Sequence, residues 1–221
     1  MSLVLDPKKV VAGAVVIVVE QWRVFAKTLL FPSLLYCVVD LAQRFEPTPA
    51  VVAVTLLLGI GLQTVIAVTT HRLVLLGPGS VPEWGLRSWT KRESLFLLYL
   101  FGLVLISMPT AVLQLIPVIG WLAMMAGMAW LASRLSLVFP AVAVEQDISF
   151  RCAWSMSAKH QWPLLITVVV FPAILSIPIV LLARVPYASL ASSLLAAAAT
   201  VLTIAALSLA YREVAHLEQH S

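Results

Sequence analysis

Three polar side chains interrupt stretches of sequence that are otherwise apolar: Asp40, Gln63 and Gln114. A carboxylate or an amide inside a membrane is a candidate for proton or ion transfer, because burying it without a partner is costly. A transport pathway needs several such groups in register, and Asp40 and Gln114 fall near the ends of their apolar stretches. Gln63 is central, but a single amide is as often a hydrogen bond between helices. The sequence therefore predicts polar positions and no relay.

Residues for enzyme chemistry are missing. The histidines at positions 71, 160, 216 and 220 have neither HExxH spacing nor the His/Cys spacing of a zinc site. The GxSxG nucleophile motif and the P-loop are also absent. We therefore predict a protein that is not an enzyme, with no catalytic, cofactor-binding or metal-binding residues and no cofactor.

Lipid must surround most of this chain. Hydrophobic residues make up 62% of it and charged residues 11%, and its mean hydropathy is +1.03; a soluble domain is about a quarter charged. The 40 residues from Ser94 to Ser133 contain no Asp, Glu, Lys or Arg, enough for two crossings at about 20 residues each. The composition predicts an all-α polytopic membrane protein in one domain. The net charge of +4 is spread over several loops, so no nucleic-acid partner is expected.

Six transmembrane helices are expected, arranged as three hairpins. Their ranges are about 25–43, 49–70, 94–114, 117–139, 163–183 and 187–210. The earlier apolar run Val10–Val19 is only half as long as a span. It is expected to lie at the interface or to dip into the bilayer, and the alternative is one long helix that continues into the first span. Four prolines interrupt spans one, three and five, as is common in membrane helices: Pro32, Pro109, Pro172 and Pro178.

The cations indicate the orientation. With six spans both termini share one side, and twelve of the 14 Lys and Arg residues fall on it; only Arg44 and Arg184 fall on the other. Because loops rich in Lys and Arg stay in the cytoplasm, we expect both termini to be cytoplasmic, in a bacterial inner membrane.

A cytoplasmic elbow is predicted at residues 133–163, between the second and third hairpins. Its segment 147–161 is an amphipathic helix capped by Asp147, with Arg151, Ser155 and Lys159 in one stripe. Trp154 lies on the opposite side as an interfacial anchor. Arg134 either snorkels to the interface or pairs with Glu145 across the elbow.

These segments supply the candidate headgroup-binding or structural residues of the elbow and of the other interfacial segments. The candidates are Trp22, Arg23, Arg87, Trp89, Arg134, Glu145, Arg151, Trp154, Lys159 and Trp162. Basic and aromatic residues suit lipid phosphates at the headgroup level. The simpler interpretation is that such helices only complete a membrane fold.

The sequence also suggests an internal repeat. Gln-Trp precedes Phe-Pro by ten residues at 21–32 and again at 161–172, and each hairpin returns at an arginine. We interpret this as three units, 7–75, 80–139 and 147–212, each with an interfacial helix followed by a hairpin.

The elbow resembles a known pattern. An arginine-ending span, a Pro-Ala step with an acid and a basic Trp/Ser helix are similar to YciC-type bacterial inner-membrane proteins and to the membrane domain of some glycerophosphodiester phosphodiesterases. The residues that carry the likeness are Arg134, Pro140, Ala141, Glu145, Arg151, Trp154, Ser155 and Trp162. The resemblance implies a role in envelope or lipid homeostasis; the phosphodiesterase's catalytic barrel has no counterpart here.

Together these features favour a non-enzymatic membrane scaffold, lipid-interacting protein or accessory subunit. Its expected partners are phospholipids and a larger membrane complex or further copies of the chain. The alternative is a small transporter with proline-broken helices. A transporter should contain a polar cavity within its spans, whereas a scaffold should pack dry.

Overall fold

The computed structural model describes residues 4–45, 47–82, 88–185 and 188–219, in which every regular element is a helix. The α-helices share strongly apolar sequences, and short 3-10 or π segments join or extend them. The α-helices are α1 (Pro7–Glu20), α2 (Trp22–Phe45), α3 (Pro49–Leu76), α4 (Lys91–Ser107), α5 (Gly120–Leu135), α6 (Val138–Ala143), α7 (Phe150–Ser157), α8 (Gln161–Leu165), α9 (Phe171–Ala183) and α10 (Ser189–Gln219).

Six helical stretches in the described residues are long and apolar enough to cross a membrane. They are Trp22–Gln43, Pro49–Leu76, Lys91–Leu115, Gly120–Ala143, Phe150–Ala183 and Ser189–Glu218. Each contains or overlaps one predicted span, which confirms their number and approximate places and makes the chain a multi-pass membrane protein. The last stretch extends well beyond the predicted residue 210, because α10 continues through the polar tail.

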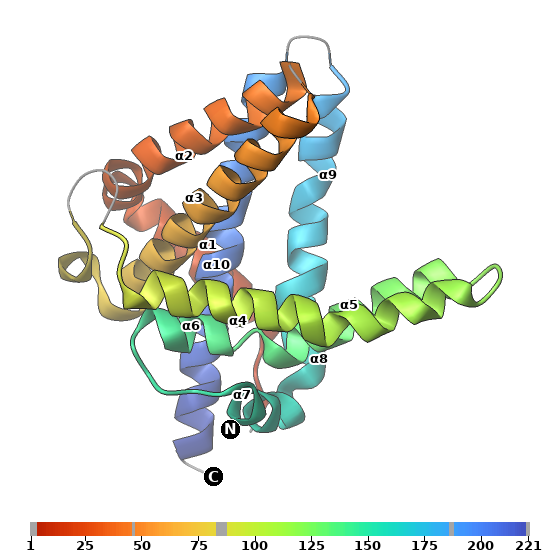
Figure 1. Cartoon of the computed structure of the whole chain (residues 1–221). Helices are drawn as coiled ribbons and strands as arrows, with labels where there is room; N and C mark the ends of the chain where they lie inside the picture. The colour runs from red at the N-terminus through yellow and green to blue at the C-terminus, as the bar shows by residue number, and fades with distance from the viewer. Residues whose placement is uncertain (1–3, 46, 83–87, 186–187, 220–221) are drawn as a thin grey trace.

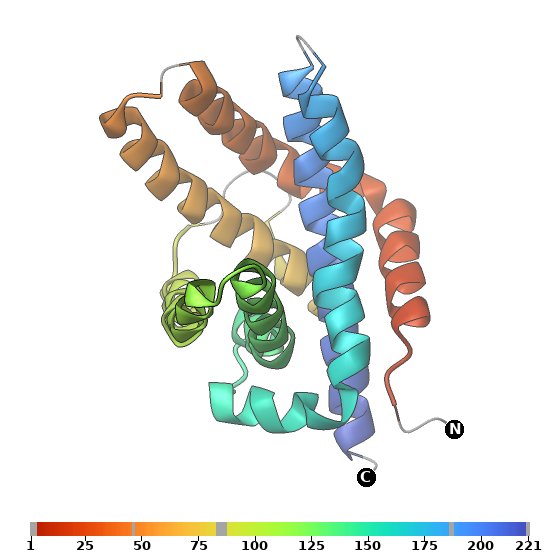
Figure 2. The ribbon, with the colours of Figure 1, turned by 90° about the vertical axis from the view of Figure 1, so that its right-hand side faces the viewer.

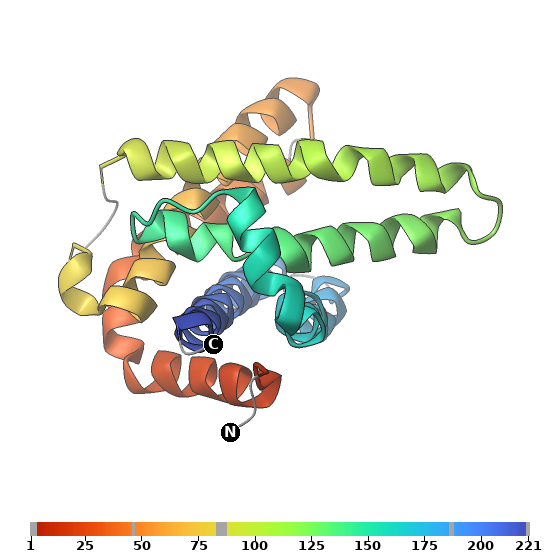
Figure 3. The same ribbon diagram turned by 90° about the horizontal axis from the view of Figure 1, so that it is seen from below.

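The long helices lie as antiparallel neighbours that leave a common base. In Figure 1, α2 with α3 and α9 with α10 rise from the base, and both described chain ends lie at its lower side. The two pairs separate toward their tips in Figure 2. The pair α4–α5 instead projects sideways, across the direction of α9 and α10, as Figure 3 shows from below. That all three pairs cross one bilayer stays a prediction.

The core is concentrated at the base, where α3, α6 and α10 meet. All six residues of α6 are buried, and so are Leu73 of α3 and Val214 of α10. Toward the tips the apolar side chains become exposed, for example Leu57 at 72% and Leu115 at 80%. This distribution fits helices whose outer faces contact lipid tails.

Helix α1 is separate from α2. It begins at the cap Asp6 and ends at Glu20, and the chain turns at Gln21 before α2. The alternative of one continuous helix is therefore wrong. Ala14 of α1 is completely buried against α10, where a Cβ on Gly13 would lie 3.2 Å from the Leu209 Cδ1 atom.

Local expectations at three other places need correction or refinement. Ser149, not Asp147, caps α7, because the Ser149 hydroxyl accepts the Cys152 N–H. At Pro109 the helix changes to a 3-10 segment, Met108–Leu115. Before Pro172 the fifth stretch contains a π-helical turn, Ile166–Val170. Single π-helical turns of this kind occur as bulges inside α-helices.

Candidate functional site

An ion cluster joins three elements at the elbow. Glu145 follows α6 and its Oε1 accepts hydrogen bonds from Arg92 Nη1 at 2.8 Å and from Arg72 Nη1 at 3.3 Å. Arg72 comes from the end of α3 and also donates to the Ala143 carbonyl at 3.0 Å. The two arginine side chains are 10% and 12% exposed, whereas that of Glu145 is 61% exposed. One carboxylate therefore holds two nearly buried cations together.

The backbone at Glu145 turns in the left-handed region, with φ at +63°. A non-glycine residue there costs about 1–2 kcal/mol, since its Cβ crowds the following carbonyl. The turn aims the side chain back toward Arg72 and Arg92, so the ion pairs offset that cost. A glycine would fit the turn more easily but would supply no carboxylate.

The start of α4 is fixed by a capping box. Thr90 is the N-cap, and Glu93 accepts from both the Thr90 N–H, at 2.7 Å, and its hydroxyl. Glu93 is only 2% exposed, and the bonds from Thr90 satisfy its buried carboxylate and the amide of the N-cap. This cap places Lys91 and Arg92 in the first turn of α4, and both residues line the neighbouring pocket.

That pocket has a volume of about 410 Å³ and is amphiphilic. Its lining residues are Thr90, Lys91, Arg92, Leu95, Tyr99, Val142, Glu145, Gln146, Asp147 and Ile148. Charged groups of both signs come from the start of α4 and from the elbow, and the remaining wall is apolar. Gln146 is held by the Tyr211 hydroxyl of α10, which donates to its Oε1, and Tyr99 packs edge-on against Phe150 at 5.0 Å.

Arg134 lies apart from this cluster. Its guanidinium carbon is 4.4 Å from the centre of the Trp154 ring, and Trp130 packs edge-on against Trp154 at 5.1 Å. The predicted alternative that Arg134 pairs with Glu145 is wrong, since Arg72 and Arg92 hold Glu145. Arg134 is 7% exposed, and its Nε atom is buried without a hydrogen-bond acceptor in the described residues.

The burial of α7 follows the predicted stripe. Arg151, Ser155 and Lys159 are exposed, whereas Ala153 and Ser157 are completely buried. The Ser157 hydroxyl donates to the Arg134 carbonyl at 2.9 Å, which ties the elbow to α5. In Figure 2 the segment α7 lies at the lower end of the molecule, where the chain leads into α8 and the long helical stretch above it.

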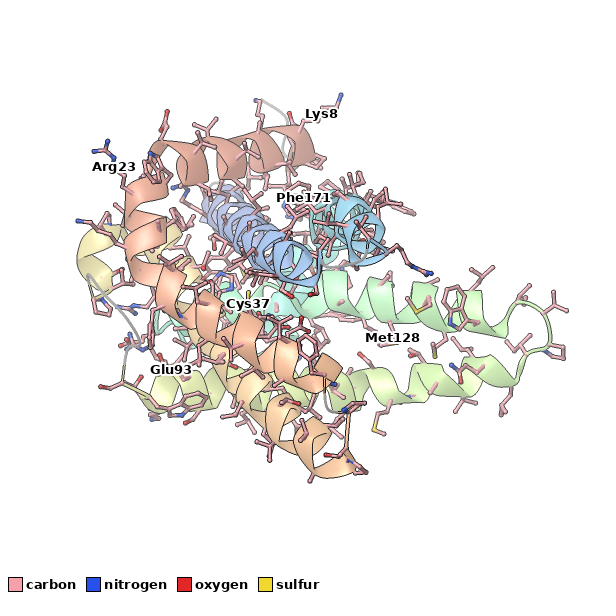
Figure 4. The ribbon with its side chains drawn as sticks, turned by 90° about the horizontal axis from the view of Figure 1, so that it is seen from above. Lys8, Arg23, Cys37, Glu93, Met128 and Phe171 are labelled. Atoms are coloured by element: carbon pink, nitrogen blue, oxygen red, sulfur yellow. The ribbon has the colours of Figure 1, made fainter. Side chains whose placement is uncertain are left out.

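The remaining predicted headgroup residues are not gathered into one site. Trp22 is exposed at the corner between α1 and α2, with the Arg23 guanidinium 5.6 Å from its ring centre. Figure 4 places Arg23 away from Glu93. Trp89 and Trp162 are exposed at 47% and 73%, and Arg87 lies outside the described residues.

Two of the three predicted intramembrane polar residues share a groove. Asp40 of α2 and Gln63 of α3 both line a cavity of about 370 Å³, together with Gln43, Thr55 and Thr64. Gln114 does not belong to it, since it is exposed in the 3-10 segment that extends α4. The groove is largely apolar around these few polar groups, and the transporter alternative stays a prediction.

Sequence reasoning missed several buried polar partners. The pairing of Glu145 with Arg72 and Arg92 was not predicted. Both arginines stand at the ends of apolar spans, and such arginines are a usable signal for an ion pair with an exposed acid. His71 Nδ1 lies 2.7 Å from Ser208 Oγ between α3 and α10. His160 is also buried, and its Nδ1 accepts the Leu5 N–H at 3.2 Å, which fastens the N-terminal segment to the elbow.

Comparisons with known proteins give no relative: no family model, curated protein or solved structure matches the chain. The resemblance of the elbow to YciC-type proteins stays a prediction. Within the described ranges no three His, Cys, Asp or Glu side chains gather as metal ligands would.

Proposed function

We propose that this chain is a non-enzymatic inner-membrane protein that acts as a scaffold, a lipid-interacting protein or an accessory subunit of a larger membrane complex, and that its elbow binds phospholipid headgroups. The amphiphilic pocket beside the ion cluster carries the proposal. A phospholipid has a charged head joined to an apolar body, and the pocket places Lys91 and Asp147 beside Leu95, Tyr99 and Ile148. Binding sites commonly combine such an apolar wall with a few polar groups.

The arginine beneath Trp154 supports the same role. Its buried Nε lacks an acceptor in the described residues, and its guanidinium is held against the indole ring. Guanidinium groups match phosphate oxygens well, so a lipid phosphate that reaches the small exposed part of this side chain would meet a donor that the indole ring holds in place. Both features lie on the side of the molecule where the predicted topology places the cytoplasmic leaflet.

The test is native mass spectrometry of the protein extracted in mild detergent. The wild type should retain phospholipid, and Lys91→Ala should reduce the retained fraction roughly fivefold, since one cation near a lipid surface contributes about 1 kcal/mol. Lys8→Ala is the control, because Lys8 is exposed on α1 and does not line the pocket. A wild type without lipid, or equal retention in the Lys91→Ala variant, would contradict the proposal. A partner in fixed stoichiometry would identify an accessory subunit.

The second candidate is a transporter, favoured by the few polar side chains, Asp40 and Gln63 among them, that line the groove between α2 and α3. If water and solute enter this groove, Gln63→Cys in a cysteine-free background should react with a membrane-impermeant maleimide. Leu57→Cys is the control, because Leu57 is 72% exposed on α3 and does not line the groove. An unreactive Gln63→Cys variant would rule out a solute pathway at this place.

A further inference from the structure

The pocket at the elbow is lined by two cations and two carboxylates, and only one of each is paired. Arg92 and Glu145 form an ion pair at 2.8 Å. Lys91 and Asp147 line the same pocket and are exposed, but neither forms an ion pair with a described residue. One cation and one carboxylate of this pocket are therefore available to a ligand.

Hydrogen bonds hold the backbone that carries these two charges. The Tyr211 hydroxyl of α10 donates to the Gln146 side chain, and the Ile148 N–H donates to the Gln146 carbonyl at 3.0 Å. Asp147 lies between these two anchored residues. Lys91 is the first residue of α4 and directly follows its capped start. The two charged groups therefore come from separate elements, and each element is held in place before a ligand arrives.

The formal charges of the lining balance, and this balance favours one class of headgroup. The cations of Lys91 and Arg92 are matched by the carboxylates of Glu145 and Asp147. An anionic headgroup offers a phosphate to Lys91 but brings no cation for Asp147, and its negative charge repels that carboxylate. A headgroup with a phosphate and an ammonium group satisfies both, because the phosphate accepts from Lys91 and the ammonium donates to Asp147.

The apolar part of the lining shows where the rest of such a ligand would lie. Leu95, Val142 and Ile148 contribute aliphatic surface to the pocket, and Tyr99 contributes a ring. The glycerol and the first carbons of the acyl chains can pack on this wall, which removes apolar surface from water. The volume of about 410 Å³ is in the range of small-molecule sites, so the pocket has space for a headgroup.

We infer that the elbow pocket is selective for a phospholipid with a zwitterionic amine headgroup, such as phosphatidylethanolamine. The inference rests on the proposed function and adds the class of headgroup to it. Lys91 binds the phosphate and Asp147 binds the ammonium group. The apolar body of the lipid lies against Leu95 and Val142.

Titration of the purified protein in detergent, followed by native mass spectrometry, tests the inference. The probes are phosphatidylethanolamine and phosphatidylglycerol with identical acyl chains. The wild type should bind the ethanolamine lipid about fivefold more tightly, the value of one exposed ion pair. Asp147→Asn should abolish this preference and still bind phosphatidylglycerol, whereas Lys91→Ala should weaken the binding of both lipids. Glu213→Gln removes an exposed acid of α10 outside this pocket and should keep the preference.

A second measurement needs no protein variant. Phosphatidylethanolamine that is acetylated on its nitrogen keeps the phosphate and loses the ammonium charge, so it should bind no more tightly than phosphatidylglycerol. Glycerophosphoethanolamine has the same headgroup without acyl chains, and at equal concentration it should not displace the lipid. Displacement would assign the site to a free solute and would overturn the inference.

The outcomes separate this inference from the proposed function. A wild type that binds neither lipid contradicts both. Equal binding of the two lipids, or of the acetylated and unmodified ethanolamine lipids, would overturn the inference alone, because the elbow would still bind phospholipid. A folded Asp147→Asn protein that keeps the preference of the wild type would also overturn it.

Discussion

At the scale of single residues, the exposed side chain of Glu145 connects two helices to the elbow. It is the common acceptor for Arg72 and Arg92, and its backbone occupies the left-handed region. Two nearly buried cations near each other repel unless an anion lies between them. The elbow therefore depends on a carboxylate at this position, and not only on a polar group.

Replacing that carboxylate by an amide should loosen the elbow. Glu145→Gln keeps the size of the side chain but removes its charge, and we expect a loss of about 1–2 kcal/mol of stability. This is less than the cost of breaking a fully buried pair, because water screens the exposed carboxylate. Thermal unfolding in detergent measures the loss. Asp147→Asn, two residues further on and exposed, is the control, and equal melting temperatures for both variants would contradict the prediction.

The pair of His71 and Ser208 gives a second residue-scale prediction. The Ser208 hydroxyl lies 2.8 Å from the Ile204 carbonyl, so it donates there and accepts from His71 Nδ1. Ser208→Ala leaves the buried imidazole without this acceptor and should cost about 1–2 kcal/mol. Ser176→Ala removes an exposed hydroxyl that bonds within its own helix and should change the melting temperature much less. Similar shifts in the two variants would show that the interhelical bond contributes little.

At the scale of elements, the contact between α1 and α10 decides where the N-terminal helix lies. Small residues let the two helices approach, since Ala14 is completely buried and Gly13 faces Leu209. Close approach through small side chains is a common way to pack helices within membranes. The small residues of α1 therefore serve a specific contact with α10.

A larger side chain at this contact should separate the helices. Ala14→Leu adds three carbons to a position without space, and such overpacking costs about 1–3 kcal/mol. The expected result is a lower melting temperature and faster proteolysis before Glu20. Val16→Leu, on the exposed side of α1, should leave both unchanged. An Ala14→Leu protein as stable as the wild type would show that α1 does not dock tightly.

At the scale of the whole molecule, three helix pairs share one base and diverge from it. The divergence follows from the distribution of buried residues, because α4 buries Arg92, Glu93 and Phe96 near its start and little beyond them. The packing that holds the molecule together is therefore at the end that carries the elbow and both described termini. The tips have few contacts with one another.

The predicted orientation can be tested with single-cysteine variants in a Cys37→Ala, Cys152→Ala background. Lys8→Cys and Lys159→Cys should react with an impermeant thiol reagent only from the cytoplasmic side. Val118→Cys, at a 98% exposed turn, should react from the outside. Labelling of Lys8→Cys and Lys159→Cys from opposite sides would contradict an even number of crossings between them.

The long helices could be predicted because hydropathy is a local property of sequence. The stretch from Ser94 to Ser133 is apolar whatever it packs against, so its two helices follow from composition. The partner of Glu145 is different, since it depends on how α3 and α4 are placed against α6. Arg134 is closer in sequence, but the ion pairs form with Arg72 and Arg92, which are 73 and 53 residues away.

The groove between α2 and α3 could be predicted in part, unlike the partners of Glu145. Asp40 and Gln63 lie on the neighbouring antiparallel helices α2 and α3. The hairpin predicted from the sequence already makes these two helices neighbours. Sequence alone does not give the rotation of each helix about its axis, and that rotation decides whether the two side chains face one another. The Ser193 hydroxyl of α10 donates to Asp40 Oδ2 at 2.7 Å, and this contact requires packing between separate hairpins and had no sequence signal.

The bond between the Leu5 amide and His160 has a consequence for biosynthesis. Its partners are 155 residues apart, so the segment at Leu5 can dock only after His160 and the rest of the elbow have been synthesised. Contacts of such large sequence separation form late. Until then this bond cannot form, and the contact of α1 with α10 must wait longer still, because α10 follows the elbow in the chain. A bulky fusion placed directly before Leu5 would interfere with this last step, whereas the same fusion after Gln219 would leave it unhindered.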